Sequence, residues 1–356
     1  MTEQDDYPVA LQDGRTRYAV LGAGAVGGVI GCALSRGGHE VVLIDPWPEN
    51  VDAINAFGLT VEDPNGETHT VHPRAFHISD LASLKGRFDV VYLSLKSYDT
   101  RWAALLIEPH LAPGGCIVSA QNGINEESIG ELVGRERVVG CVLLISAGMY
   151  EPGNVVRTGF ASSNAFLVGE TDGSETERAG RVVDSLAKMG SGSVTRNLIG
   201  HRWAKLAHNC FTNGVAGITG LASGELRMNP EVAEIGVHII AEAVTVGRAD
   251  GVEIGQVFGI PAALYTQAVG DQAAMEEVLA SLAASAPTAV SGRPSLAQDL
   301  VKGRRTEIDF LNGYVATRGA KKNISTPLNA RIAATVREIA ARRLTQSIEN
   351  LRFLDR

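Results

Sequence analysis

The stretch YAVLGAGAVGG, Tyr18 to Gly28, decides the fold. Its four leading residues predict a short buried strand, and the glycines that follow predict a tight turn that opens an apolar helical segment reaching Arg36. The next apolar run, from Glu40 to Ile44, is again typical of a strand. A strand, a turn, a helix and a second strand in this order predict the first unit of a parallel sheet covered by helices.

The glycines of this turn have the spacing G-x-G-x-x-G, at Gly22, Gly24 and Gly27. The first glycine permits the turn, the second lets the backbone approach a pyrophosphate, and the third lets the helix pack on the strand. The start of the helix, at Ala25 and Val26, offers backbone N–H groups and the positive end of the helix dipole to the phosphates. The turn therefore predicts a dinucleotide-binding site.

Asp45 closes the second strand. A carboxylate there can accept hydrogen bonds from both ribose hydroxyls of NAD, and it would repel the 2′-phosphate of NADP. Residues 46–50 contain no lysine or arginine to bind that phosphate. The pattern favours NAD(H), with NADP(H) second. In the alternative interpretation, Asp45 only caps the turn.

Strand and helix patterns alternate through the first half of the chain and then change. Further strands are expected at 90–95, 115–119 and within 154–170, a hairpin at 59–71, and helices at 100–107 and 176–189. After about Leu198 long helical patterns dominate, with breaks at 229–230, 251, 287–294 and 326–327. We expect an α/β fold with a loose leader at 1–16, an N-terminal Rossmann dinucleotide-binding domain at 17–196 and an all-helical C-terminal domain for substrate and catalysis at 197–356.

Composition sets limits on the partners. The 356 residues, 45% hydrophobic and 20% charged, can bury two cores, and a net charge of −8 disfavours nucleic acid and anionic membranes. The chain starts without a signal-peptide pattern and has no apolar run of membrane-spanning length, so a cytoplasmic protein is expected. Four scattered cysteines without a C-x-x-C pair suit reduced buried thiols, and no residue set has metal-ligand spacing. Apolar segments in the helical half are compatible with a homodimer.

The segment WAKLAHNCFTNG, Trp203 to Gly214, carries a polar stripe. Lys205, Asn209 and Asn213 drift by only about 40° per step on a helix, so they project from one side. An ordinary solvent-facing helix is the alternative, but asparagine is a poor helix former and is rarely chosen for that purpose. The stripe is more typical of a surface that binds a ligand. His201 and His208 beside it are interpreted as helix-surface histidines outside the site.

Motifs between about Arg17 and about Arg342 together resemble the ketopantoate reductase (2-dehydropantoate 2-reductase) family. They are the glycine turn, the strand ending in Leu95-Lys96, the turn Gln121-Asn122-Gly123, the helix WAKLAHNCFTN, the turn Gly224-Glu225-Leu226 and the stretch PSLAQDLVKGRRTEIDFLNG at 294–313. The resemblance implies a Rossmann domain joined to a helical domain, with the substrate in the cleft between them. It also implies reduction of a 2-oxo acid to a 2-hydroxy acid with NAD(P)H, first of all 2-dehydropantoate to pantoate in pantothenate biosynthesis.

The resemblance also implies roles for the stripe. The family's general acid, which protonates the carbonyl oxygen, matches Lys205, and its acidic partner matches Glu307. The family's substrate-holding residues match Asn209, Asn213 and Ser295. The reaction requires such groups independently of any resemblance. Hydride attack builds negative charge on the carbonyl oxygen, and a cation that releases a proton neutralises this charge.

Two further residues are expected to contact the cofactor. Asn122 lies in a turn at the end of a predicted strand, where ligands bind in open α/β sheets, so it is assigned to the nicotinamide side. A purely turn-forming Asn-Gly pair is the alternative. Lys96 matches a family lysine near the adenosine phosphate, and with Asp45 present a ribose or pyrophosphate contact is equally compatible.

The chain departs from the family at two places expected to line the far end of the substrate pocket. After Asn213 it reads Gly214-Val215-Ala216, where many relatives have a proline and then a threonine two places on, and 255–293 is long and apolar. Two alternatives therefore stay open. One is an NAD-dependent enzyme for a bulkier 2-oxo or 2-hydroxy acid, and the other is a non-catalytic NAD-sensing protein on the same fold.

Overall fold

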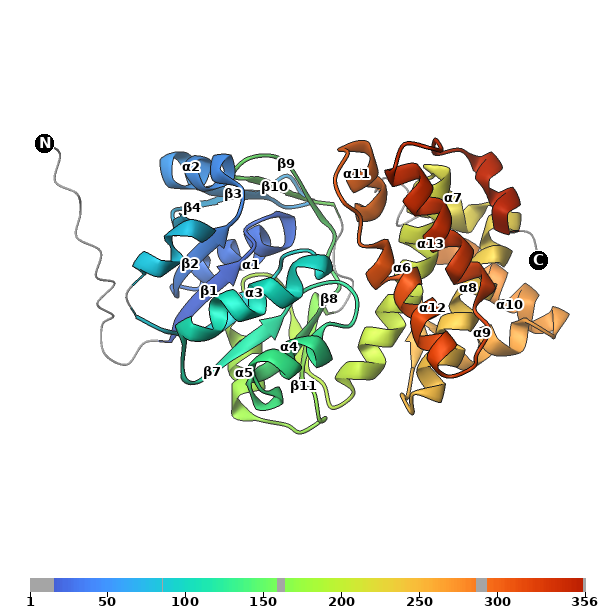
Figure 1. The fold of residues 1–356 in the computed structure, drawn as a ribbon, viewed down its shortest axis with the longest axis horizontal. Helices are drawn as coiled ribbons and strands as arrows, with labels where there is room; N and C mark the ends of the chain where they lie inside the picture. The colour runs from blue at the N-terminus through green and yellow to red at the C-terminus, as the bar shows by residue number, and fades with distance from the viewer. Residues whose placement is uncertain (1–15, 85, 159–163, 286–292, 355–356) are drawn as a thin grey trace, which may run out of the picture. The chain divides into compact units, whose positions relative to one another are not determined.

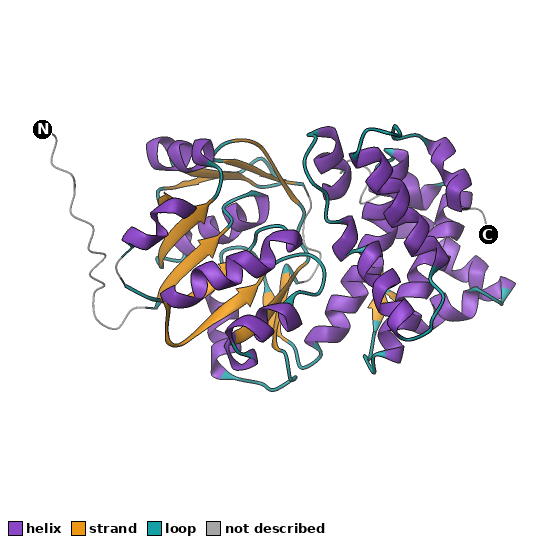
Figure 2. Cartoon of the chain, in the orientation of Figure 1, coloured by secondary structure: helices purple, strands orange, loops and turns teal. Residues whose placement is uncertain are grey.

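The computed structural model describes residues 16–84, 86–158, 164–285 and 293–354 (Figure 1). The chain divides into two compact units, of which the first ends at Leu198 and the second begins at Ile199. The first holds the large sheet and the second is built of helices (Figure 2), so the predicted α/β fold with a helical C-terminal domain is confirmed. Residues 1–15 of the expected leader, and most of the break expected at 287–294, lie outside the described residues.

An eight-stranded sheet forms the centre of the first unit, in the order β12-β11-β8-β7-β6-β1-β2-β5. All pairs from β5 to β8 are parallel, and β11 runs antiparallel to β8. The chain passes from β1 to β2 on one side and later reaches β6 on the other, so the carboxyl ends of β1 and β6 form the switch point where such sheets bind ligands. The strands are β1 (Arg17–Leu21), β2 (Glu40–Asp45), β5 (Arg74–His77), β6 (Phe88–Leu93), β7 (Leu111–Ser119), β8 (Val138–Leu143), β11 (Phe166–Glu170) and β12 (Gly192–Val194).

Both faces of this sheet are buried, and β1 shows how the sequence produces this. Tyr18 and Val20 pack into a core shared with helices α1 (Ala25–Arg36), α2 (Pro48–Phe57) and α5 (Glu177–Ser185). Ala19 and Leu21 face the opposite core, with α3 (Thr100–Ile107) and α4 (Glu126–Val133). Because successive residues of a strand point to opposite faces, a run of apolar residues is what a doubly covered parallel strand requires.

A second, four-stranded sheet has the order β4-β3-β10-β9. The predicted hairpin is confirmed as β3 (Leu59–Glu62) and β4 (Thr68–Val71), joined by a turn in which the Gly66 amide donates to the Asp63 carbonyl. The other strands are β9 (Ala147–Glu151) and β10 (Asn154–Arg157). Short 3-10 turns complete the unit at η1 (Ile78–Ser83), η2 (Ser97–Asp99), η3 (Glu108–His110) and η4 (Arg135–Arg137).

The second unit is organised around α8 (Pro230–Ala249), which packs against most of the other helices of this unit. It begins at the predicted break because the Asn229 side chain accepts a hydrogen bond from the Val232 amide and Pro230 takes the first helical position. None of the helices in the described residues is long and apolar enough to cross a membrane. The other elements are α6 (Leu198–Thr219), α7 (Ser223–Met228), α9 (Ala262–Ala268), α10 (Gln272–Ser285), α11 (Ser295–Val301), η6 (Ile308–Phe310), α12 (Asn312–Lys321), α13 (Pro327–Ala340) and η7 (Ile348–Leu354).

A buried polar network joins four of these helices. Glu242 on α8 accepts hydrogen bonds from the Leu328 and Asn329 amides, which start α13, and from the Asn329 side chain. Asn329 in turn accepts from Asn312 Nδ2, which also donates to the Cys210 carbonyl of α6 at 3.0 Å. Asn312 and Asn329 are completely buried, so these bonds fix α6 against α12 and α13.

One short ribbon departs from the all-helical expectation for the second unit. Strands β13 (Gln256–Val257) and β14 (Ile260–Pro261) pair antiparallel around Phe258 and Gly259, whose φ angles are +54° and +76°. Two positive φ angles at the tip are the pattern of a type I′ turn. The sequence does not predict this turn, because Phe258 is its first central residue, where asparagine, aspartate or glycine is usual.

Candidate active site

The glycine turn lies at the carboxyl end of β1, at the switch point of the sheet. Gly22 has φ +99°, and a Cβ there would lie 2.8 Å from the Leu95 amide nitrogen, so only glycine fits this turn. Ser94 reinforces the turn, since its hydroxyl donates to the Gly22 carbonyl at 2.7 Å and its amide donates to the Leu21 carbonyl at 3.0 Å. The ends of β1 and β6 are thereby joined directly beneath the turn.

Gly24 and Gly27 differ sharply in the space around them. A Cβ on Gly27 would lie 1.8 Å from the Gly22 carbonyl oxygen and 2.6 Å from Ser94 Oγ. A Cβ on Gly24 would meet nothing within 4 Å. Gly27 therefore serves helix packing, whereas Gly24 faces open space, next to the amide groups of Ala25 and Val26 at the start of α1. This is the arrangement that a pyrophosphate requires.

Asp45 lies at the end of β2 and is only 6% exposed. Its Oδ2 accepts a hydrogen bond from the Ala23 amide at 2.5 Å, and its Oδ1 accepts one from the Trp47 amide at 2.9 Å. The carboxylate therefore holds the glycine turn to β2, as the turn-capping interpretation requires. Its negative charge also lies beside the turn, where it bears on the choice of cofactor.

The turn after β7 lies on the same edge of the sheet. Gln121 Nε2 donates to the Leu95 carbonyl at 2.8 Å, which ties this turn to the one after β6. The Asn122 carbonyl accepts from Ser97 Oγ and from Asn125 Nδ2, whereas no hydrogen bond of the Asn122 side-chain amide is found among the described residues. Asn122 thus has a fixed backbone and an amide available to a ligand. Lys96 is half-buried between these turns, at the start of η2.

Helix α6 carries the polar stripe, and the structure corrects the idea of a solvent face for it. Asn209 and Asn213 are 6% and 7% exposed, and Asn213 Nδ2 donates to Asn209 Oδ1 at 3.2 Å. Asn213 Oδ1 accepts from the Ser295 hydroxyl at 3.2 Å and from the Leu296 amide at 3.1 Å. The three predicted substrate residues therefore form one polar group where α6 meets the start of α11, with both asparagines buried and Ser295 half-buried.

Lys205 and Glu307 belong to the same unit as this group. Lys205 is half-buried on α6, one turn before Asn209. Glu307 is 4% exposed and precedes η6, with its carbonyl accepting a hydrogen bond from the Phe310 amide. A nearly buried carboxylate and a half-buried lysine are unusual for solvent-facing charges and are typical of residues that act on a ligand or on one another.

The histidines are less exposed than expected. The His208 ring lies 4.2 Å from the Phe258 ring, centroid to centroid, and its Nδ1 is hydrogen-bonded to Asn209 Oδ1 at 3.3 Å. Burial lowers the pKa of His208 to about 4, with smaller contributions from the cations Arg227 and Lys205. Burial also lowers the pKa of His201. His208 is therefore only partly exposed, since Phe258 at the tip of the β13–β14 ribbon packs against its ring.

The Gly214 to Ala216 segment continues α6 and forms no turn. Gly214, Val215 and Ala216 are buried, and a Cβ on Gly214 would lie 2.7 Å from Asn312 Oδ1 and 2.9 Å from Ile332 Cγ2. Gly214 therefore packs against α12 and α13, and the expectation that the segment lines the substrate pocket stays a prediction. Of the 255–293 stretch, α9 and α10 pack on α8, and Phe258 contacts the stripe helix through His208.

Sequence reasoning missed residues that hold the site in place. Asn50 is completely buried; its Nδ2 donates to the Ala23 carbonyl, and its Oδ1 accepts from the Gly153 amide. It connects the glycine turn to the β9–β10 hairpin, and an asparagine inside a helical segment was the available signal. Ser94 gave no signal, because its partner is a backbone carbonyl far away in the sequence. Gln121 is part of a recognised turn motif, but its bond to the Leu95 carbonyl has no local signal.

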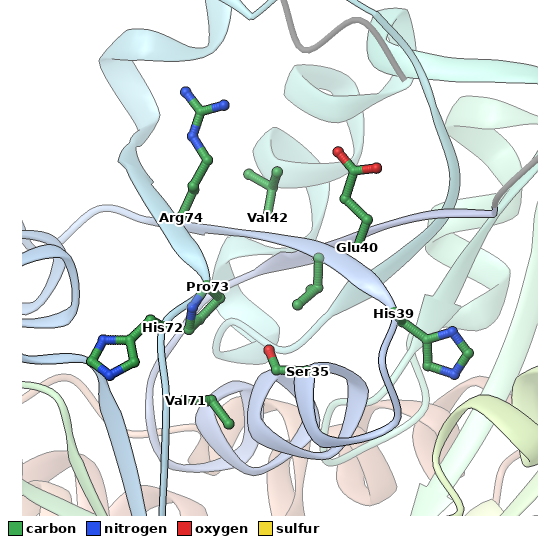
Figure 3. A pocket seen from close by; sticks show the side chains of 9 residues that line it. Ser35, His39, Glu40, Val42, Val71, His72, Pro73 and Arg74 are labelled. Carbon is green, nitrogen blue, oxygen red and sulfur yellow. The ribbon is translucent and has the colours of Figure 1, made fainter. Parts of the chain in front are cut away.

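The other described residues were searched for a metal site and for a second ligand-binding pocket. No group of three or more His, Cys, Asp or Glu side chains that could hold a metal is found among the described residues. A shallow hollow of about 420 Å³ lies at the amino ends of β2 and β5, lined by Ser35, His39, His72 and Arg74 among others (Figure 3). It is on the edge of the sheet opposite to the glycine turn, so it is no part of the site described above.

Comparisons with known proteins cover most of the chain. The family described as "Ketopantoate reductase PanE/ApbA" matches residues 18–173, and its C-terminal counterpart matches residues 197–340. A 2-dehydropantoate 2-reductase of Pyrococcus horikoshii is 29% identical, over 89% of this chain and 95% of its own length. The structure of a PanE/ApbA family ketopantoate reductase from Ralstonia eutropha is 31% identical, with 92% and 99% covered and a TM-score of 0.75. D-mandelate dehydrogenase with NADH and anilino(oxo)acetate has the same fold, at 24% identity, the same coverage and a TM-score of 0.78.

Proposed function

The chain belongs to the ketopantoate reductase family, and from that premise we propose that it reduces a 2-oxo acid to a 2-hydroxy acid, with 2-dehydropantoate as the first candidate substrate. It is an NAD(P)-dependent oxidoreductase that acts on CH–OH groups. The observation that carries the proposal is the hydrogen-bonded group of Asn209, Asn213 and Ser295, in which Asn209 lies one helical turn after Lys205.

The nicotinamide cofactor, when bound, supplies the hydride that the carbonyl carbon receives. The Gly22 to Gly27 turn fits the dinucleotide, because Gly24 leaves open space beside the amides of α1. We assign Lys96 to the ribose or pyrophosphate and the unengaged amide of Asn122 to the nicotinamide end. These residues hold the cofactor at the carboxyl edge of the sheet and take no part in proton transfer.

The residues assigned to proton transfer, Lys205 and Glu307, belong to the second unit. As hydride reaches the carbonyl carbon, the Lys205 ammonium donates its proton to the carbonyl oxygen, so that C=O becomes CH–OH and the neutral amine later takes up a proton from water. The nearly buried carboxylate of Glu307 favours the charged form of the lysine or accepts a hydrogen bond from the new hydroxyl. The amides of Asn209 and Asn213 orient the acid without adding charge.

Lys205→Ala tests the proton donor. Its kcat should fall at least about 100-fold, the usual effect of losing a general acid, while NADH binding stays close to that of the natural protein. Lys321→Ala, which removes an exposed lysine of α12, is the matched control and should keep full activity. Unchanged turnover in the Lys205 variant would rule out the assigned role.

Substrate choice is tested by NADH oxidation with 2-dehydropantoate, branched 2-oxo acids and aromatic 2-oxo acids. Simple ketones and aldehydes should fail, because a carboxylate is required. The highest kcat/KM with 2-dehydropantoate supports the first candidate. The highest kcat/KM with a bulkier acid makes that acid the substrate and leaves the proposed reaction unchanged. NADH binding without reduction of any acid would favour the non-catalytic alternative.

We also propose NADH as the better reductant, since the Asp45 charge beside the glycine turn repels a 2′-phosphate and residues 46–50 contain no cation to bind one. The test compares kcat/KM for NADH and NADPH in the natural protein. Asp45→Asn should narrow the gap, and its unfolding must be measured alongside because the carboxylate also holds backbone amides. A higher kcat/KM with NADPH in the natural protein contradicts the argument.

The remaining proposals concern assembly and location. The acidic net charge of −8 argues against nucleic acid and anionic membranes as partners, and we propose a cytoplasmic homodimer. Light scattering after size exclusion measures the mass in solution, and a monomer at micromolar concentration would contradict the dimer.

A further inference from the structure

His208 on α6 contacts the polar group assigned to the substrate. Its Nδ1 lies 3.3 Å from Asn209 Oδ1, and its ring packs on the Phe258 ring, 4.2 Å away between centroids. His208 is half-buried, whereas Asn209 is nearly completely buried. The sequence pattern placed His208 outside the site, and nothing in that pattern predicts this contact.

The hydrogen bonds of the polar group can be given a direction, starting from a backbone amide. The Leu296 N–H can only donate, and it donates to Asn213 at 3.1 Å, so this side of the Asn213 amide must be the oxygen Oδ1. The Ser295 hydroxyl donates to the same oxygen at 3.2 Å. The other side of Asn213 is then the nitrogen Nδ2, which donates to Asn209 at 3.2 Å. Asn209 must therefore receive this bond with its own oxygen.

The same reasoning determines which ring nitrogen of His208 carries the proton. An amide oxygen only accepts, so His208 Nδ1 must hold a hydrogen and donate it to Asn209 Oδ1. Burial lowers the pKa of His208 to about 4, with smaller contributions from the cations Arg227 and Lys205, so the ring is neutral near pH 7 and holds a single proton. That proton lies on Nδ1, although a neutral imidazole in water carries it more often on Nε2.

Two donors on one oxygen determine what Asn209 offers to a ligand. An amide oxygen has two lone pairs, and the bonds from Asn213 and His208 use both of them. One bond alone would let the amide turn about it, whereas two bonds fix the plane of the amide. No hydrogen bond of Asn209 Nδ2 is found among the described residues, so this nitrogen is the group that Asn209 presents to a ligand.

We propose that His208 is a positioning residue, which holds the Asn209 amide with its nitrogen toward the substrate. Asn209 then donates to an acceptor of the 2-oxo acid, either the carboxylate or the carbonyl oxygen. The inference rests on the proposed reduction at Lys205 and adds a residue to its substrate site. An amide turned the other way would bring its oxygen against the carboxylate, and two acceptors cannot bond to each other. His208 acts through Asn209 and is not a catalytic residue.

Two substitutions of His208 separate positioning from packing. His208→Phe keeps a ring against Phe258 and removes the donor, whereas His208→Asn keeps a donor close to the place of Nδ1 and removes the ring. KM is measured with the 2-oxo acid that the natural protein reduces best, starting from 2-dehydropantoate. It should rise about fivefold in His208→Phe, the effect of one neutral hydrogen bond, with kcat and the KM for NADH little changed.

The asparagine variant should give the opposite combination of effects. His208→Asn should recover most of the natural KM, because the donor to Asn209 is restored, and yet it should melt at a lower temperature than His208→Phe, because the ring contact with Phe258 is lost. A purely structural His208 predicts that the variant with lower stability also has the higher KM. His201→Phe changes the other half-buried histidine of α6 and, as the matched control, should leave KM unchanged.

The position of the proton is measured without turnover, which keeps the inference separate from the proposed function. Nuclear magnetic resonance of the natural protein with nitrogen-labelled histidines, near neutral pH, should show His208 Nδ1 protonated and Nε2 unprotonated. The signals are assigned by their absence from the spectrum of His208→Phe or, if that variant does not fold, of His208→Asn. This result does not depend on which acid the protein reduces.

Three results would overturn the inference. The first is a proton on Nε2 of His208, which leaves the reductase intact. The second is an unchanged KM in His208→Phe together with a raised KM in His208→Asn, which would make the ring purely structural. The third is a natural protein that reduces no 2-oxo acid, which refutes the reductase as well; a proton on Nδ1 would then show only how Asn209 is oriented.

Discussion

Gly24→Ala and Gly27→Ala should separate cofactor binding from stability within one turn. The Gly27 methyl would lie 1.8 Å from the Gly22 carbonyl oxygen, and that partner is backbone, which cannot rotate away. The helix must shift by more than about 1 Å to restore a normal contact, so a loss of about 3 kcal/mol or more in unfolding free energy is expected, the upper end for overpacking. The Gly24 methyl meets nothing within 4 Å, so stability should change by less than about 0.5 kcal/mol.

NADH affinity should fall in Gly24→Ala, the variant whose stability is expected to change little. A methyl on Gly24 occupies the space through which a pyrophosphate would reach the α1 amides, and the loss of one hydrogen bond to a charged group, about 1.5–3 kcal/mol, weakens NADH binding by about 10- to 100-fold. Urea unfolding gives the stability, and calorimetric titration gives the NADH affinity at a temperature where both variants are folded. A Gly24 variant that binds NADH normally, or that is as unstable as the Gly27 variant, refutes the separation of roles.

Three other changes test the second unit. Burial lowers the pKa of His208 from 6.5 to about 4, so the folded protein holds this ring in its neutral form. The resulting contribution to the unfolding free energy, at most about 3 kcal/mol, is complete above pH 6.5 and is lost as the pH falls to 4. The unfolding free energy of His208→Gln should therefore fall less between pH 6.5 and pH 4 than that of the natural protein. Gly214→Ala should destabilise by about 1–2 kcal/mol despite better helix propensity, because its methyl would press on the bonded amide of Asn312; equal or higher stability in urea contradicts this. Glu242→Gln should cost about 1–3 kcal/mol, since an amide nitrogen cannot accept the backbone N–H groups that start α13; an unchanged urea midpoint would show that those bonds are dispensable.

The parts of the fold that the sequence predicted well have a strong local cause. The helix at 100–107 and the hairpin around Gly66 coincide with α3 and with β3–β4, because periodicity and turn chemistry lie within a few residues there. The G-x-G-x-x-G spacing identified three glycines with three different environments. The strand expected at 90–95 is displaced to Phe88–Leu93, since Ser94 and Leu95 belong to the turn that meets the glycines.

What the sequence could not predict depends on distant partners. The spacing of Asn209 and Asn213 predicted a shared face, but their burial depends on Ser295 and Leu296, more than 80 positions away. The close packing of Gly214 against Asn312 and Ile332 could not be predicted either, because both partners lie about a hundred positions away.

The bond between Asn312 and the Cys210 carbonyl makes one link between helices independent of the side chain at its acceptor. The Asn312 amide, on α12, donates to a backbone carbonyl of α6, and every residue type at position 210 would supply the same acceptor. Substitution of Cys210 therefore leaves this link in place, whereas replacement of Asn312 by any residue without a side-chain donor removes it.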